Sequence, residues 1–138
     1  HVSYHFPRSG LAFTADTLMA LGCGRLFEGT AAQMWESLSR LRALPSDTTI
    51  CSGHEYTASN ARFALSVDPD NEALRARAEA VRQARGRDEP TVPSRLSEEV
   101  ATNPFLRADD PAMKRRMGME GAGDAEVFAA IRAAKDRF

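Results

Sequence analysis

Apolar and polar residues alternate near the start of the chain in a pattern that predicts two short β-strands. Residues 2–6 and 11–15 carry strand-favouring side chains, and Pro-Arg-Ser-Gly at 7–10 is typical of a turn. A hairpin that pairs Phe6 with Leu11 also brings His1 opposite Asp16, so these two side chains are expected at one end of the sheet.

A loop, a helix and a third strand follow this hairpin. Residues 22–29 are punctuated by glycine and predict a loop. Thr30 and Gln33 then form a capping-box pattern, which starts a helix that ends before Pro45. Residues 48–51 predict another short strand. Strands that alternate with a helix in this way indicate an α/β fold.

After residue 55 the pattern becomes helical, with no clear strand. We expect helices at residues 56–67, at residues 72–85, in a short segment ending before Asn103, in a short segment from Pro111 to near Gly118, and from Asp124, as its cap, to the end. The chain is therefore divided into an α/β part, residues 1–55, and an all-helical part, residues 56–138.

Composition narrows the classes of protein that the chain can represent. The chain has 138 residues, a formal net charge of −1 and basic residues scattered among acidic ones, which argues against a nucleic-acid partner. No apolar run approaches the roughly 20 residues that cross a bilayer. Cys23 and Cys51 make no disulfide framework. We expect a soluble cytoplasmic protein, and a fragment, because a strand begins at the first residue without an initiator Met.

Two residues that follow predicted strands are candidates for chemistry. Asp16 follows the second strand and His54 the third, and sites in α/β proteins gather at strand ends of this kind. Together with His1 they offer the oxygen and nitrogen ligands that zinc, iron and manganese take in proteins. The alternative is plain turn capping or a satisfied hydrogen bond. His5 lies out of phase with them and is expected not to be a ligand.

Several short motifs are spread along the chain. They are Ala-Asp-Thr-Leu at 15–18, Gly-Cys-Gly-Arg-Leu-Phe-Glu-Gly-Thr at 22–30, Gly-His-Glu-Tyr-Thr at 53–57, Glu-Pro-Thr-Val-Pro-Ser at 89–94, Asn-Pro-Phe-Leu-Arg at 103–107 and Lys-Asp-Arg-Phe at 135–138. Together these motifs resemble those of glyoxalase II, the hydroxyacylglutathione hydrolases of the metallo-β-lactamase superfamily. The resemblance covers the whole chain. It implies the second half of an αββα sandwich over residues 1–55, followed by a helical glutathione-binding domain over residues 56–138.

The resemblance also implies a role for individual residues. Asp16 matches a carboxylate that bridges two metal ions, and His1 and His54 match one ligand of each. The glutathione-binding positions of the family match Arg25, Tyr56, Asn60, Arg132 and Lys135. The last two are three residues apart and share a helix face, although a solvated helix end explains that spacing equally well.

The implied reaction is hydrolysis of S-(2-hydroxyacyl)glutathione, typically S-D-lactoylglutathione, in methylglyoxal detoxification. Two divalent ions, zinc or alternatively iron or manganese, would activate a bridging hydroxide as the nucleophile. The rival interpretations are a persulfide dioxygenase and a non-catalytic glutathione-binding or structural remnant. The pattern leaves the oligomeric state open.

Two departures from the family pattern stand out. Ala15 replaces a glycine before the bridging carboxylate, and the effect of its methyl group depends on the backbone angles there. The Thr-His-x-His-x-Asp-His motif, which supplies two ligands to each metal, is missing from the chain. The chain alone is therefore expected to be inactive.

Overall fold

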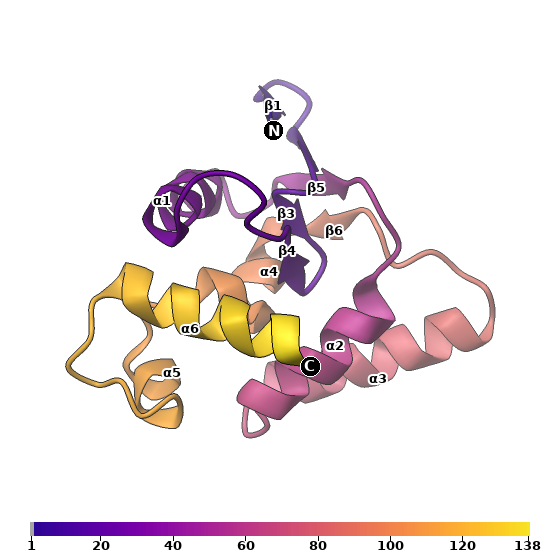
Figure 1. Cartoon of the computed structure of the whole chain (residues 1–138). Coiled ribbons are helices and arrows are strands. Elements are labelled where there is room, and N and C mark those ends of the chain that lie inside the picture. The colour runs from indigo at the N-terminus through magenta and orange to yellow at the C-terminus, as the bar shows by residue number, and fades with distance from the viewer. Residues whose placement is uncertain (1) are drawn as a thin grey trace.

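A four-stranded sheet with helices packed beneath it forms the framework of the chain (Figure 1). The computed structural model describes residues 2–138. The strands of the sheet lie in the order β1 (Tyr4–Phe6), β2 (Leu11–Ala15), β5 (Thr49–Ser52) and β6 (Ser94–Arg95). A separate two-stranded hairpin is formed by β3 (Leu18–Met19) and β4 (Gly22–Cys23). The helices are α1 (Ala31–Arg42), α2 (Thr57–Val67), α3 (Glu72–Gly86), α4 (Leu96–Thr102), the 3-10 turn η1 (Pro104–Leu106), α5 (Pro111–Arg116) and α6 (Asp124–Arg137).

The predicted hairpin register is confirmed. Strands β1 and β2 are antiparallel with Phe6 opposite Leu11 and Tyr4 opposite Phe13. Strand β2 then runs parallel to β5, with Phe13 opposite Cys51. Because parallel strands end at the same edge of a sheet, the residues that leave β2 and β5 meet at one place.

Local signals set the helix starts. The capping box predicted at Thr30 and Gln33 is present at the start of α1, and the side chain of Asn71 caps α3. Asp110 caps α5 through the backbone N–H of Ala112. The last helix differs slightly from the prediction, because Gly123 is its N-cap and Asp124 its first helical residue.

One expectation for the second half of the chain is wrong. Residues 56–138 were expected to contain no strand, but β6 pairs antiparallel with β5, with Arg95 opposite Thr49. Residues 22–29 were expected to be all loop, but Gly22–Cys23 forms a strand of the β3–β4 hairpin. Both strands are only two residues long, so they carry no periodicity that a sequence pattern could reveal.

The core joins the two parts of the chain. Ala12 and Ile50 from the sheet and Leu38 from α1 pack in one cluster with Phe105 and Phe128. The side chain of Trp35 in α1 lies 6.0 Å, ring centre to ring centre, from that of Phe128 in α6. The division at residue 55 stays a prediction, since one apolar core runs across it.

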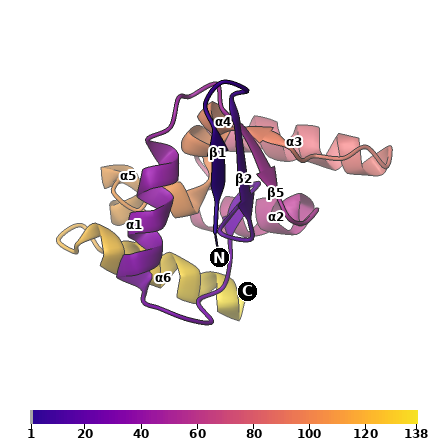
Figure 2. The same ribbon diagram turned by 90° about the horizontal axis from the view of Figure 1, so that it is seen from above.

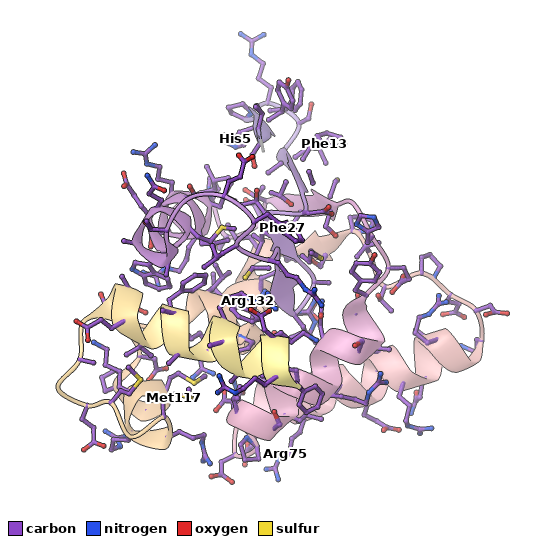
Figure 3. All side chains as sticks on the ribbon, in the orientation of Figure 1. His5, Phe13, Phe27, Arg75, Met117 and Arg132 are labelled. Carbon is purple, nitrogen blue, oxygen red and sulfur yellow. The ribbon has the colours of Figure 1, made fainter. Side chains whose placement is uncertain are left out.

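The outer face of the β1–β2 ribbon carries exposed apolar side chains. Seen from above, β1 and β2 lie in front of the helices (Figure 2). Val2, Tyr4, Phe6 and Phe13 are 67%, 61%, 48% and 45% exposed, although Phe6 and Phe13 pack edge to face. Phe13 is labelled in Figure 3. A group of exposed apolar side chains of this kind is typical of an interaction surface. Along residues 2–138 no helix is both long and apolar enough to span a membrane.

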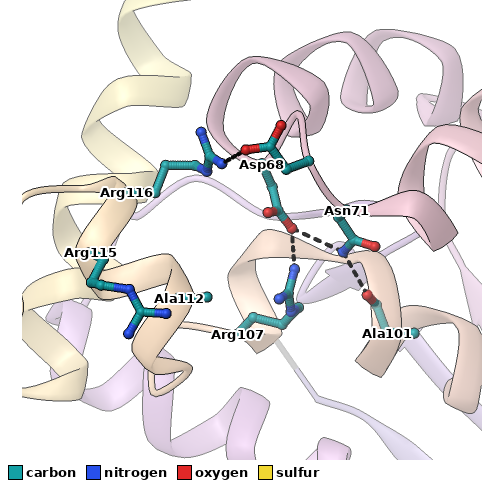
Figure 4. Close-up of a pocket in the computed structure, with 8 residues that line it drawn as sticks. Asp68, Asn71, Ala101, Arg107, Ala112, Arg115 and Arg116 are labelled. Atoms are coloured by element: carbon teal, nitrogen blue, oxygen red, sulfur yellow. Dashed lines mark hydrogen bonds and ion pairs between the residues drawn. The ribbon is translucent and has the colours of Figure 1, made fainter.

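A polar hollow of about 630 Å³ lies where α5 meets the turn between α2 and α3 (Figure 4). Arg107 and Asn71 both donate to Asp68, and Asn71 also donates to the carbonyl of Ala101. Arg116 pairs with Asp70. Because these opposite charges satisfy one another, we interpret the hollow as a structural junction between helices.

Candidate functional site

Asp16 and His54 meet at the ends of the two parallel strands. The Nδ1 atom of His54 lies 2.7 Å from Oδ1 of Asp16, and the side chains of His54 and Asp16 remain 47% and 35% exposed. The backbone N–H of Gly53 donates to the carbonyl of Ala15 and ties the two strand ends together. The predicted convergence is confirmed for these two side chains. The third candidate, His1, lies outside the described residues.

Small residues allow the strand ends to come this close. A methyl group at Gly53 would lie 2.8 Å from Oδ1 of Asp16, and one at Gly24 would lie 2.4 Å from the Asp16 carbonyl oxygen. Ala15, before the carboxylate, has a φ of +46°, in the left-handed region that favours glycine. The turn is therefore built for residues without a side chain, and Ala15 occupies it under strain.

A second contact holds the imidazole of His54 through the face of its ring. The Tyr56 ring stacks on it, with ring centres 4.8 Å apart and planes inclined by 1°. With Nδ1 facing the Asp16 carboxylate, both the position and the plane of the imidazole are fixed. Nε2 is then the ring nitrogen left for another partner.

A cleft of about 790 Å³ opens beside this pair. Its lining includes every described residue that the sequence put forward as a site residue, and Phe27 and Arg132 are labelled in Figure 3. It is lined by Asp16, Met19, Cys23, Gly24, Arg25, Phe27, His54, Tyr56, Ser59, Asn60, Arg62, Arg132, Lys135, Asp136 and Phe138. Sequence reasoning missed Arg62 and Ser59, because only the packing of α2 beside α6 brings them to the cleft.

Positive charge dominates the cleft. Across residues 2–138 the side chains of Arg25, Arg62 and Lys135 form no hydrogen bond or ion pair. Burial lowers the pKa of Lys135, and three neighbouring guanidinium groups lower it further. These belong to Arg132, Arg62 and Arg25. Cations gathered in a concave site without counter-charges attract an anionic ligand.

Arg132 and Asn60 differ from these cations because they are buried in contacts with the chain itself. Arg132 is 4% exposed and donates to the carbonyl of Cys23 at 2.8 Å and to Oδ1 of Asp136 at 2.9 Å. Asn60 donates to the carbonyl of Ala20 at 3.1 Å. Both residues border the cleft, and their role as ligand contacts stays a prediction.

The thiol of Cys23 also lines the cleft. Burial raises the pKa of this thiol to about 12, although the nearby Arg132 acts in the opposite direction. The thiol is therefore protonated at neutral pH, and only a thiolate is an effective nucleophile. We conclude that Cys23 packs the cleft wall and does not attack a substrate.

The donor types at the strand ends suit a metal ion, but their number is small. A carboxylate oxygen and an imidazole nitrogen are both ligands of zinc and related metals. Within the part of the chain that the structure describes, His, Cys, Asp and Glu do not gather in any group of three or more that could hold a metal. Asp16 and His54 thus fit as part of a metal site, for which zinc requires about four donors.

The fold and the cleft together define an α/β protein with a cleft at the carboxyl ends of its parallel strands, where ligand sites of such folds usually lie. A family model described as "Hydroxyacylglutathione hydrolase C-terminus" matches residues 55–138. The whole chain is 65% identical to the hydroxyacylglutathione hydrolase of Ruegeria pomeroyi, 62% to that of Maricaulis maris and 61% to that of Mesorhizobium japonicum. The chain belongs to the hydroxyacylglutathione hydrolase family. It covers 54% of each of these relatives, so it spans about half their length.

Proposed function

We propose that the protein containing this chain hydrolyses S-(2-hydroxyacyl)glutathione, with S-D-lactoylglutathione as the typical substrate, to glutathione and a 2-hydroxy acid such as D-lactate. The observation that carries the proposal is the Asp16–His54 pair beside a cleft with unpaired cations. A glutathione thioester carries two carboxylates, which suit those cations. The relatives that match the whole chain bear the name of this activity.

Asp16 and His54 would hold part of a site for two divalent ions, most simply zinc, with iron or manganese as alternatives. Such ions, when bound, lower the pKa of water toward neutrality and polarise a thioester carbonyl. The Asp16 carboxylate faces Nδ1 of His54 and so selects the tautomer in which Nε2 accepts. The stacked Tyr56 keeps the imidazole plane in place.

The cleft would supply binding and orientation. Arg25 and Lys135 would attract the peptide carboxylates, while the exposed Phe27 and Phe138 would cover the cysteine side chain that carries the thioester. Such contacts lie away from the bond that breaks, and they act by holding the thioester carbonyl near the strand ends. The chain offers no serine or cysteine nucleophile with a base partner among the cleft residues described, so hydrolysis would need activated water.

The exposed face of the β1–β2 ribbon supports the finer part of the fold proposal. Val2, Tyr4, Phe6 and Phe13 form an uncovered apolar surface, and the relatives are about twice as long as this chain. We infer that a second sheet packs on this surface, which would complete an αββα sandwich of the metallo-β-lactamase type. The two free cysteines are in keeping with a cytoplasmic protein.

The test is steady-state turnover by the full reading frame that contains this chain. We expect release of glutathione from S-D-lactoylglutathione, and far lower kcat/KM for the lactoyl thioester of N-acetylcysteamine, which lacks the peptide carboxylates. Oxygen consumption with glutathione persulfide, and no thioester turnover, would identify a persulfide dioxygenase. Glutathione binding without either reaction would identify a non-catalytic remnant.

A further inference from the structure

The segment that joins β5 to α2 is held by its side chains and not by its own backbone. Strand β5 ends at Ser52, and the backbone N–H of Gly53 still donates to the carbonyl of Ala15 at 2.9 Å. The backbone groups of the next two residues, His54 and Glu55, form no hydrogen bond within the part of the chain that the structure describes. The path of the segment therefore depends on where its side chains are anchored.

Three consecutive side chains provide these anchors. The rings of His54 and Tyr56 stack on each other and line the cleft, where His54 also faces Asp16. Glu55, between them, does not line the cleft and reaches instead to Thr91. It is thus the one residue of the three whose side chain ties the segment to the chain between α3 and β6.

The carboxylate of Glu55 makes a two-point contact with Thr91. One of its oxygens accepts from the backbone N–H of Thr91 at 2.7 Å, and the other accepts from the hydroxyl group at 2.5 Å. The guanidinium of Arg85, in the last turn of α3, lies 4.0 Å from the same carboxylate. Hydrogen bonds to an ionised acceptor are stronger than those between neutral groups, so this contact suits an anchor.

Thr91 is itself held on both sides along the chain. The backbone N–H of Glu89 donates to a carbonyl in the last turn of α3 at 2.8 Å, and Ser94 pairs with Ile50 of β5. The chain from α3 to β6 runs beside the segment that leaves β5 (Figure 1). Glu55 therefore links the exit of β5 to the entry of β6, which is a neighbouring strand of the same sheet.

We propose that Glu55 is a positioning residue. Through Thr91 it fixes the segment after β5, so that His54 stays beside Asp16 and stacked on Tyr56. The assignment rests on the proposed function, in which Asp16 and His54 hold part of a metal site. Glu55 acts as a hydrogen-bonding group away from the cleft, and its charge is not required. A carboxamide of the same shape can accept from the Thr91 N–H and donate to the hydroxyl oxygen.

The first test is the zinc affinity of the full reading frame protein, measured by competition with a chelator. Glu55→Ala should weaken zinc binding by about tenfold, since groups that orient metal ligands commonly contribute this much. Glu55→Gln should stay within about twofold of the wild-type affinity, because the amide keeps both contacts with Thr91. Glu89→Ala removes a neighbouring carboxylate that pairs with Arg87, and it should bind zinc as the wild-type protein does.

A double-mutant cycle tests whether Glu55 acts through Thr91. Thr91→Val removes the hydroxyl group and leaves the backbone N–H, so it should weaken zinc binding by less than Glu55→Ala does. Thr91→Val should cause no further loss when it is added to Glu55→Ala, because its hydroxyl group acts through that carboxylate. Losses that multiply in the double variant would overturn the assignment.

The imidazole of His54 reports its own position in the metal-free protein. The stacked ring of Tyr56 should shift the NMR signals of the His54 ring protons, and Glu55→Ala should reduce this shift while Glu55→Gln preserves it. Unchanged His54 signals in Glu55→Ala, or an equal loss of zinc affinity in Glu55→Gln and Glu55→Ala, would overturn the assignment. A wild-type protein that shows the expected NMR signals but binds no zinc would overturn the proposed metal site and leave Glu55 as a positioning residue.

Discussion

The side-chain methyl group of Ala15 strains the backbone of the turn before Asp16. Its φ of +46° costs an L-residue about 1–2 kcal/mol, whereas glycine adopts it freely. Replacing alanine by glycine also adds freedom to the unfolded chain, which costs about 0.4–1 kcal/mol. The strain in the folded chain is the larger of these two effects. We therefore expect Ala15→Gly to raise the free energy of unfolding in urea by about 0.5–1 kcal/mol.

A matched control lies three residues earlier in the same strand. Ala12 is buried in regular β2 backbone, so Ala12→Gly should lower the free energy of unfolding by about 0.5–1 kcal/mol or more. Two variants with the same change of composition should thus move stability in opposite directions. A loss of stability in Ala15→Gly would show that backbone strain at Ala15 is smaller than the freedom that glycine adds to the unfolded chain.

Lys135 should give stability a dependence on alkaline pH. Its pKa in the folded chain is lowered from the ordinary value of 10.5, first by burial and then by three guanidinium groups, and the carboxylate of Asp136 opposes them. Between the lowered pKa and 10.5 the unfolded chain binds more protons than the folded one, so stability rises with pH in that window. Lys135→Met should abolish this rise in urea unfolding curves. Arg62→Gln should reduce it, and an unchanged rise in both variants would refute the coupling.

At the scale of elements, local chemistry explains what the sequence could predict. The turn at 7–10 and the capping box at Thr30 act within a few residues, so the hairpin and the start of α1 could be predicted. The β3–β4 hairpin and β6 could not. Leu21, at the tip of that hairpin, has a φ of +58° and is held by the carboxylate of Glu99, 78 positions along the chain. No local pattern carries such information.

The side chain of Glu99, in α4, forms hydrogen bonds to α3, β6 and this hairpin. Its fully buried carboxylate accepts from the backbone N–H of Leu21 at 2.9 Å, from Arg77 at 2.5 Å and from Ser94 at 2.6 Å. The side-chain amide of Asn103 donates to the carboxylate of Glu99 at 3.2 Å. It also donates to the carbonyls on both sides of the hairpin tip. The hairpin follows Asp16 in the chain and ends at the cleft wall, so this network indirectly supports the site.

Breaking the network should be costly. Glu99→Leu removes the fully buried carboxylate that pairs with the buried Arg77 guanidinium, and losing one member of a buried ion pair costs about 3–5 kcal/mol. Glu98 contacts the same guanidinium at 2.7 Å from a half-exposed position. Glu98→Gln should therefore cost less than about 1 kcal/mol. Equal losses for the two variants in urea unfolding would contradict the role given to the buried carboxylate.

At the scale of the whole molecule, the candidate site could be predicted only in part. Asp16 and His54 follow strands, and strand ends in a parallel pair must meet, so their contact was foreseeable. Arg62 reaches the cleft through the packing of α2 against α6, which depends on side chains distant in sequence. The exposed side chains of the β1–β2 face, such as Phe13, follow the strand alternation but give no information on what would pack against them.

The chain by itself should bind metal weakly and hydrolyse no thioester. Asp16 and His54 offer two donors where zinc requires about four. Metal analysis after dialysis should therefore find well under one zinc per chain, and S-D-lactoylglutathione should remain intact. Stoichiometric zinc that resists dialysis, or turnover at the rate of the full reading frame, would mean that this half of the family's length makes a complete centre.

The most direct test of the proposed reaction centre is hydrolysis of S-D-lactoylglutathione by the full reading frame with Asp16→Ala. If the strand-end pair is the reaction centre, kcat should fall by at least about a hundredfold while the melting temperature stays near that of the wild-type protein. An Asp16→Ala variant that folds normally and retains wild-type kcat would contradict the placement of the reaction at this cleft.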